Sequence, residues 1–449
     1  MFIYDAARKI NSYRKIRKKA IAGQHLSPVR RIERTAPLKG VRHVAMTFDD
    51  GPCAVPPGPW DSGTDQRKLT EVILDALNKY NAKATFNVIG TTEDNYPDKR
   101  GNINSFSWGG LRFDHYPDFQ KDSLAGVKNQ IGLAARMVAE GHELSNHGYR
   151  HILFGPMKLV YRQREYFKKL QEVIDDLWKL HSLVLKELNY TIRLARPPHY
   201  IDKIPDSHSA YDAFSHMGYQ YLAASYDGGG WKATCGSYEK DVDGMVRPLE
   251  EALLKDPSCL NGQIIFHKDG CNMSKQTPVA HSLEKQLKLL SEAGYKVLTV
   301  SELIALSPFE DIDDSDPAFE SVRYLAGRGF CIGYRNNTFQ ADRVLTKGEL
   351  GIMLTPHNVS GHVKGSTEWA LLQPCFKAFF DSRHRFNPEE PVSAKEFESF
   401  LDKVLSGKNI SWSWNDNKNS GMGAVNPARL RRRDVIDVLC LIDKQNAIK

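Results

Sequence analysis

Short apolar runs alternate with helical patterns along the chain from about residue 41 to residue 306. Apolar runs bounded by turn residues predict strands, and apolar residues spaced three and four apart predict helices. We expect strands at residues 42–49, 83–90, 143–145, 192–195, 219–225, 263–266 and 295–300. We expect helices at residues 67–80, 127–140, 159–188, 208–216, 243–255 and 279–293. Repeated strand–helix units favour a parallel sheet, and this many units predict an α/β fold of the (β/α) barrel type.

The pattern changes after Ser307, where Pro308 and an acidic linker follow. Beyond the linker the sequence holds helical stretches without the strand–helix alternation. A chain of 449 residues is expected to hold two or three domains. We therefore expect a barrel over residues 41–306 and a smaller, mainly helical domain over residues 307–449.

The net charge of +7 is concentrated in residues 1–40, a basic arm with eleven Lys and Arg residues against Asp5 and Glu33. Apolar residues recur between these cations at helical spacing. Three interpretations remain open: a helix on an anionic membrane surface, a nucleic-acid-binding arm, or a solvated helix docked on the body. We favour the docked helix. Aromatic residues are not interleaved with the basic ones, so no nucleic-acid partner is expected.

The remaining composition is typical of soluble globular proteins, with 41% hydrophobic and 26% charged residues. No run of about eighteen apolar residues occurs, so no transmembrane helix is expected. Residues 1–19 lack the unbroken apolar core of a signal peptide. The seven cysteines form no C-x-x-C pair, which excludes a zinc knuckle.

Two adjacent carboxylates, Asp49 and Asp50, end the first predicted strand, and Gly51 and Pro52 turn the chain after them. Neighbouring residues of a strand point to opposite faces, so both side chains reach one rim only if the strand ends there. Carboxylates at a buried strand end are costly unless a metal, a base partner or water satisfies them. We expect the chemistry of the protein at this place.

Other polar side chains follow the later strands in the same way, as expected when the carboxyl-terminal rim of a barrel carries the site. They are His147 and His151, Arg196, Asp227 and His267. The two histidines lie four residues apart, a spacing that metal sites use. Two histidines and one carboxylate with open positions form a catalytic rather than a structural metal site.

This set allows the two aspartates to take different roles. One would bind a metal that activates water and polarises a substrate carbonyl. The other would accept the proton of the water. His267 is the natural candidate to protonate the leaving atom.

In this order the clusters resemble the polysaccharide deacetylase family (carbohydrate esterase family four). Its five motifs are found at residues 47–52, 147–151, 196–198, 227–231 and 265–267. The resemblance covers about residues 40–306. It implies a distorted (β/α) barrel that hydrolyses the acetamide of N-acetylhexosamine residues in a glycan, such as cell-wall peptidoglycan or a chitin-like oligomer.

The resemblance also implies a role for most of the matched residues. Asp49 would be the base, while Asp50, His147 and His151 would hold one divalent metal. Zinc is the expected metal, with cobalt, nickel or manganese as alternatives. His267 would be the acid.

The remaining motifs imply further catalytic and substrate-binding residues. Arg196 would orient the base, and Asp227 would complete the catalytic set. The main chain near Pro198 and His199 would help to hold the oxyanion, with Tyr200 next to them. Trp231 would form a wall of the sugar pocket.

The sequence departs from the family pattern at two places. His199 stands where an aromatic residue usually follows the two prolines, with Tyr200 next. Gly230 stands where a second Asp usually precedes the Trp. Without that carboxylate an imidazolium at His267 is less stabilised, and Asp269 or Asp241 could replace it as the acid.

The C-terminal region resembles S-layer homology repeats. Residues 309–350 look like one repeat, residues 380–397 like a second, weaker copy, and a third is sought around residues 412–441. Such repeats typically anchor proteins to bacterial cell-wall polymers, which suggests the cell envelope as the location. The alternative is a helical accessory domain that packs on the barrel.

Two other functions remain open. A barrel of the same fold could hydrolyse a cyclic amide or imide. The chain could also be a catalytically degenerate protein that only binds the cell wall, although pure binding requires no Asp–Asp and His–His sets.

Overall fold

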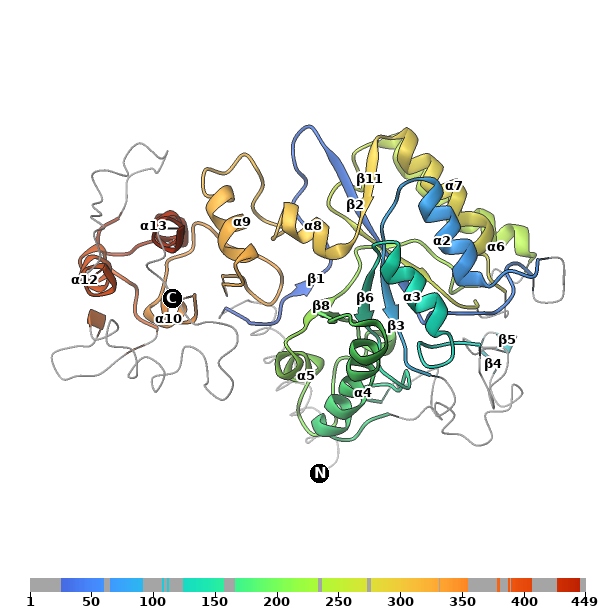
Figure 1. Ribbon diagram of the computed structural model, residues 1–449. Coiled ribbons are helices and arrows are strands. Elements are labelled where there is room, and N and C mark those ends of the chain that lie inside the picture. Colours follow the sequence, from blue (N-terminus) through green and yellow to red (C-terminus); the bar gives the residue numbers. More distant parts are fainter. Residues whose placement is uncertain are drawn as a thin grey trace, which may run out of the picture. The chain divides into compact units, whose positions relative to one another are not determined.

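The computed structural model of the chain is shown in Figure 1. It describes residues 26–59, 65–91, 107–108, 111–112, 124–156, 166–232, 236–272, 276–330, 332–353, 378–379, 387, 389–405 and 426–444. Contacts divide the chain into one unit of residues Arg31–Ile304 and a second that joins the residues up to Arg30 with Ala305–Lys449. Residues 1–25, which hold most of the predicted basic arm, lie outside the described residues.

The first unit is built on a nine-stranded sheet in which every pairing is parallel. Its order is β1–β8–β7–β6–β3–β2–β10–β9, with β11 paired to the amino-terminal half of β2. The strands are β1 (Arg31–Ile32), β2 (Arg42–Asp49), β3 (Thr85–Val88), β6 (Glu143–Asn146), β7 (Leu194–Ala195), β8 (Gln220–Leu222), β9 (Tyr226–Asp227), β10 (Ile264–Lys268) and β11 (Tyr295–Leu298). Within the described chain, β1 and β9 end this order without pairing to each other, so the barrel is open there. A separate antiparallel pair joins β4 (Ser107–Trp108) to β5 (Leu111–Arg112).

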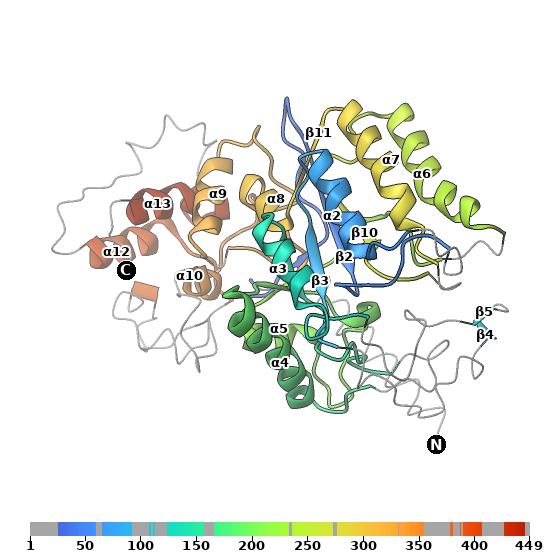
Figure 2. The same ribbon diagram turned by 45° about the vertical axis from the view of Figure 1, so that its right-hand side comes forward.

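Helices cover the outer face of the sheet, as Figures 1 and 2 show. Neighbours in this layer follow the order α6, α7, α2, α3, α4, α5. They are α2 (Leu69–Lys79), α3 (Ile131–Ala139), α4 (Leu170–Leu188), α5 (Ala210–Met217), α6 (Tyr238–Lys255) and α7 (Val279–Glu292). The inner face of the sheet encloses a core of small and branched residues that includes Ile32, Ala45, Leu194, Leu222 and Ile264. The predicted α/β fold with a barrel-like parallel sheet is therefore confirmed.

Most element bounds differ from the predicted ones by a few residues, and three of these differences change an element. The long helix predicted from residue 159 begins as α4 at Leu170. The strand predicted at 219–225 is replaced by the shorter β8 and β9. The last strand stops at Leu298 because Thr299 caps helix α8 (Val300–Leu306): Glu302 accepts from the Thr299 amide and Thr299 Oγ1 accepts from the Glu302 amide.

The second unit is helical, as predicted for the C-terminal region. Its helices are α9 (Phe319–Gly327), α10 (Lys347–Met353), α12 (Ala394–Leu405) and α13 (Arg432–Lys444). A short polar residue or Arg before α10, α12 and α13 donates its amide to an acidic side chain three residues later; the pairs are Thr346 with Glu349, Ser393 with Glu396, and Arg431 with Asp434. Each of the three helices thus begins with an acidic side chain capping its first turn.

The segments before these three helices bind one another in a ring. Leu345 donates its amide to Leu430 O, Leu430 donates to Val392 O, and Val392 donates to Leu345 O, at 2.8 to 2.9 Å. A closed cycle of this kind places three equivalent segments around one axis. Leu430 lies within residues 412–441, where a third repeat is sought, while residues 406–425 lie outside the described chain.

Residues from the amino-terminal side complete this second unit. Leu26 forms an antiparallel bridge with Tyr334, and Arg30 donates to Pro308 O at 2.6 Å and to Asn337 Oδ1 at 2.7 Å. The Arg30 guanidinium also lies over the Phe309 ring. Among the described residues, no helix has the length and apolar content needed to cross a membrane.

Candidate active site

Asp49 ends β2 on the inner face of the sheet, with 5% of its surface exposed. Its Oδ1 accepts two short hydrogen bonds, from Arg196 Nη1 at 2.5 Å and from Asn87 Nδ2 at 2.6 Å. Asn87 is its register partner on β3. Sequence reasoning missed Asn87, although it follows the same rule as the other site residues, a polar side chain near the end of a strand.

Arg196 holds Asp49 from the end of β7 and is fully buried. Its guanidinium donates to Leu222 O and Ala223 O on the next strand segment and to Thr47 Oγ1 at 3.0 Å. Because these partners fix the guanidinium plane, the charge that faces Asp49 has one orientation. The arrangement matches the orienting role that the sequence resemblance implied for Arg196.

Asp50 turns toward the same rim because the strand ends there. Its φ of 80° lies in the left-handed region, which takes the chain out of the strand alternation. Asp50 Oδ1 lies 3.0 Å from His151 Nε2 and 3.4 Å from His147 Nε2. The next residue must be a glycine, because a Cβ at Gly51 would lie 1.9 Å from Asp269 Oδ2.

Asp50, His147 and His151 form the one group of potential metal ligands found among the described residues, and all three are buried. Their ligand atoms lie within 4.8 Å of one another. Ligands about 2.0–2.2 Å from a tetrahedral zinc ion stand roughly 3.3–3.6 Å apart, which fits the 3.4 Å to His147 and is somewhat longer than the 3.0 Å to His151. His147 Nδ1 donates to the backbone oxygen of Arg196 at 2.8 Å, which leaves the Nε2 lone pair toward the cluster. The donor set and its tautomer therefore fit a divalent metal.

The Pro198–Tyr200 turn lies beside this cluster. His199 and Tyr200 have φ values of 54° and 56°, and left-handed non-glycine residues cost on the order of 1–3 kcal/mol each. The His199 ring lies 5.4 Å from the His151 ring, and the Tyr200 ring lies 5.3 Å from the Arg196 guanidinium. Burial raises the pKa of Tyr200 to about 12, so its hydroxyl stays neutral.

Asp227 and Trp231 interact with each other at the end of β9. Asp227 accepts from Trp231 Nε1 at 3.0 Å and from the Gly229 amide at 3.0 Å. Gly230 has a φ of 90°, and a Cβ there would lie 3.3 Å from Met245 and 3.8 Å from the Lys268 amide. The Cβ of an aspartate at position 230 would therefore lie next to the backbone of Lys268.

The structure does not bring His267 to the site. Strand β10 pairs with β2 so that His267 stands opposite Phe48 and Lys268 opposite Asp49. Partners in a parallel pair project to the same face, so His267 lies on the helix-covered face, where its ring stacks on Phe48 at 5.4 Å. Burial lowers the pKa of His267 to about 4, although the Asp227 charge and the backbone of Gly228 oppose this. A neutral imidazole therefore lies on the face opposite Asp49, apart from the other predicted site residues.

Lys268 takes the position on the inner face that was predicted for His267. Its ammonium pairs with Asp50 Oδ2, and the side chain is buried. At the inner rim a lysine, Lys268, therefore stands beside Asp50, and position 230 is a glycine. Side chains alternate between the two faces of a strand, and Thr47 and Asp49 share one face of β2. Applying the same alternation to β10 in register with β2 would have placed Lys268 on the face of Asp49.

The two substitute acids lie below the rim. Asp269 is fully buried under Gly51 and accepts from Thr70 Oγ1 at 2.7 Å. Burial raises the pKa of Asp269 to about 8, opposed by Thr70 and reinforced by the Asp50 charge. Asp241 lies on α6, where it accepts from Asn272 Nδ2 at 2.9 Å.

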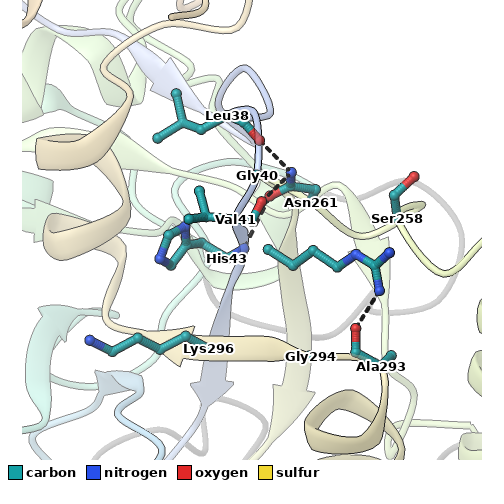
Figure 3. A pocket seen from close by; sticks show the side chains of 10 residues that line it. Leu38, Gly40, Val41, His43, Ser258, Asn261, Ala293, Gly294 and Lys296 are labelled. Carbon is teal, nitrogen blue, oxygen red and sulfur yellow. Dashed lines mark hydrogen bonds between the residues drawn. The ribbon is translucent and has the colours of Figure 1, made fainter.

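A pocket of about 620 Å³ opens at the other end of β2 (Figure 3). Asn261 binds the loop there, donating to Leu38 O and Val41 O and accepting from the His43 amide. Arg42 donates to Ala293 O at 2.5 Å. These polar groups form hydrogen bonds within the protein. The pocket lies at the amino ends of the strands and is therefore separate from the Asp49 rim at their carboxyl ends.

Two family models match the chain. Residues 38–221 match the polysaccharide deacetylase family, and residues 308–350 match the S-layer homology domain. The chain therefore carries a polysaccharide deacetylase domain followed by an S-layer homology domain, as the sequence predicted.

Known proteins with similar sequences are peptidoglycan and chitooligosaccharide deacetylases. A peptidoglycan-N-acetylglucosamine deacetylase of Bacillus cereus is 26% identical over 58% of this chain and 87% of its own length. The peptidoglycan-N-acetylglucosamine deacetylase PgdA of Listeria monocytogenes is 24% identical over 58% of this chain and 39% of its own. The chain thus spans most of the first relative and well under half of the second.

A solved structure of the peptidoglycan deacetylase PdaC from Bacillus subtilis also matches. It is 20% identical over 59% of this chain and 90% of its own, with a TM-score of 0.37. The fold assignment rests on the strand pairing described above.

Proposed function

We propose that this chain, which carries a polysaccharide deacetylase domain, removes acetyl groups from N-acetylhexosamine residues of a cell-wall glycan. One observation carries the proposal. The buried Asp50–His147–His151 cluster lies beside a second carboxylate, Asp49, which Arg196 and Asn87 hold through one oxygen only. A metal site with an oriented general base next to it can catalyse the hydrolysis of an amide.

Peptidoglycan is the first substrate to test, since relatives of this chain are peptidoglycan deacetylases by name. A chitin-like oligomer is the second, because a further relative is a chitooligosaccharide deacetylase. Trp231, His199 and Tyr200 would contact the sugar. Their positions around the rim support this assignment.

Asp50, His147 and His151 would hold one divalent ion, zinc first, with cobalt, nickel or manganese as alternatives. When bound, the ion activates water and polarises the acetamide carbonyl. Asp49 would take the proton of the water through Oδ2, since Oδ1 is held by Arg196 and Asn87 and Oδ2 lies 3.7 Å from His147 Nε2. The main chain near Pro198 and His199 would help to hold the carbonyl oxygen, with the donor at His199 because proline has no N–H.

The leaving nitrogen must receive a proton before it departs. Since His267 lies on the opposite face, we propose that Asp49 returns the proton it has accepted. Both transfers would then use the same oxygen, Asp49 Oδ2, on the inner face of the sheet. The positions of Asp227 and Trp231 support a role in shaping the rim.

The second unit would bind a cell-wall polymer and retain the protein at the envelope. The S-layer homology match and the ring formed by Leu345, Val392 and Leu430 support this role. Three repeats, the number in which such modules typically occur, would each contribute one segment to this ring.

The experiment is acetate release from defined N-acetylglucosamine oligomers and from peptidoglycan fragments, with and without a chelator. We expect release that the chelator abolishes and added zinc or cobalt restores. Release from cyclic amides or imides alone would favour the same-fold alternative. Glycan binding without turnover under any of the metals would show a degenerate, wall-binding protein.

A further inference from the structure

Lys268 places a positive charge directly on a proposed metal ligand. The residue closes β10, and its ammonium pairs with Asp50 Oδ2 while 3% of its surface is exposed. We propose that Lys268 acts as a built-in counter-cation of Asp50 and lowers the affinity of the site for divalent metal. The inference rests on the metal site of the proposed function and concerns how tightly that site binds.

The two oxygens of Asp50 face different partners. Oδ1 lies 3.0 Å from His151 Nε2 and 3.4 Å from His147 Nε2, so an ion bound by the three ligands would sit on that side. Oδ2 accepts from Lys268. A metal and the ammonium would therefore share one small carboxylate inside a buried site.

The charges of the inner rim are balanced without an ion. Asp49 is paired with Arg196, and Asp50 is paired with Lys268, all four with little or no exposure. Opposite charges satisfy each other in pairs when buried. A divalent ion adds two positive charges close to the Lys268 ammonium, and like charges in a buried site repel strongly because solvent screens them little.

Hydrogen bonds to a ligating carboxylate have an opposite effect, since they orient the ligand and their loss typically weakens metal binding roughly 10–100-fold. At this site Asp50 has other constraints. Its amide donates to Asn87 O at 3.2 Å, and the Gly51 turn packs on Asp269. Because the backbone already fixes Asp50, the repulsion outweighs the orienting effect of Lys268.

Because the ammonium and the ion would both bind the Asp50 carboxylate, the repulsion between them acts in the metal-bound state. The affinity of the site for a divalent metal is then set in part by a residue that is not a metal ligand.

The test compares metal binding by the full chain and by Lys268→Met, which keeps the side-chain length and removes the charge. Affinity for Zn²⁺ is measured by competition with a chromophoric chelator, and Co²⁺ binding by its d–d absorption. We expect Lys268→Met to bind at least tenfold more tightly. Lys268→Arg keeps the charge and should bind as weakly as the unchanged protein. Lys296→Met, on β11 away from the rim, is the matched control and should change nothing.

Lys268→Met leaves Asp50 buried without its partner, so the metal-free variant should be less stable. A second readout therefore follows the melting temperature, and the rise caused by Zn²⁺ should be larger in Lys268→Met than in the unchanged protein. If Lys268→Met fails to fold without metal, Lys268→Gln replaces it in both measurements. Equal or weaker binding by the uncharged variant overturns the inference and leaves the metal site intact. Absence of binding by both proteins overturns the metal site and the inference together.

Discussion

His147 donates a hydrogen bond from Nδ1 to the backbone oxygen of Arg196, across 2.8 Å. Arg196 in turn donates from its guanidinium to Asp49 Oδ1 at 2.5 Å. One residue at the end of β7 therefore fixes a proposed metal ligand through its backbone and the proposed base through its side chain. The two functions can be separated by substitution, because side-chain changes at Asp49 leave the His147–Arg196 backbone contact in place.

Asp49→Asn should abolish most acetate release and retain the metal. The amide has nearly the same shape but cannot accept the proton of water, and loss of a general base costs roughly 10²–10⁴-fold in rate. Acetate release and metal content are measured on the same preparation. Unchanged activity would remove Asp49 as the base, and lost metal would make it a ligand instead.

Asp50→Ala should remove the metal along with the activity, because two imidazoles alone make an incomplete site. Metal content after dialysis against limiting zinc is the measurement. Asp227→Asn serves as the control, since Asp227 bonds Trp231 and Gly229 outside the proposed ligand set. Full zinc occupancy in Asp50→Ala would contradict the ligand assignment.

The strand-end rule led from the sequence to the candidate site, because Asp49 ends one strand of the parallel sheet and His147 and Arg196 each directly follow another. It did not say which face a residue occupies. Residues 264–266 are Ile, Ile and Phe, all apolar because parallel strands are buried on both faces. Such a run hides the alternation, so His267 and Lys268 could be separated only by the register with β2.

Other features depended on tertiary contacts that a sequence pattern does not carry. β1 has two residues, Arg31 and Ile32, and exists because it pairs with β8. The ring of Leu345, Val392 and Leu430 joins segments far apart in the chain. By contrast, the Thr299–Glu302 cap that ends β11 was readable as a capping-box signature.

Arg432→Ala should destabilise the helical unit while leaving the deacetylase site active on soluble oligomers. Arg432 is fully buried, donates to Phe339 O at 2.7 Å and lies over the Phe339 and Tyr334 rings. Losing it leaves buried carbonyls without a donor, at about 1–3 kcal/mol each. Limited proteolysis should then cut residues 305–449 sooner, with acetate release from short oligomers unchanged. A parallel loss of activity would show that the two units depend on each other.

His267→Leu tests whether His267 takes part in catalysis from its position on β10. A leucine of similar volume suits the apolar surroundings of Phe48, so the variant should fold and keep acetate release within about tenfold of the unchanged protein. A general acid would instead cost roughly 10²–10⁴-fold. A loss of that size in folded His267→Leu would restore His267 to the mechanism and contradict the face assignment.

The same variant should change how stability depends on pH. Burial lowers the pKa of folded His267 to about 4, while an unfolded histidine titrates near about 6.5. Between these values the unfolded state binds a proton that the folded state does not, so this residue lowers stability as pH falls from about 6.5 toward about 4. The loss between pH 7 and pH 5 is about 2 kcal/mol, and His267→Leu should lack it. Urea unfolding at both pH values measures the difference, with His216→Leu, exposed on α5, as the control. An equal pH dependence in His267→Leu and the unchanged protein would show that the imidazole is accessible to protons in the folded state.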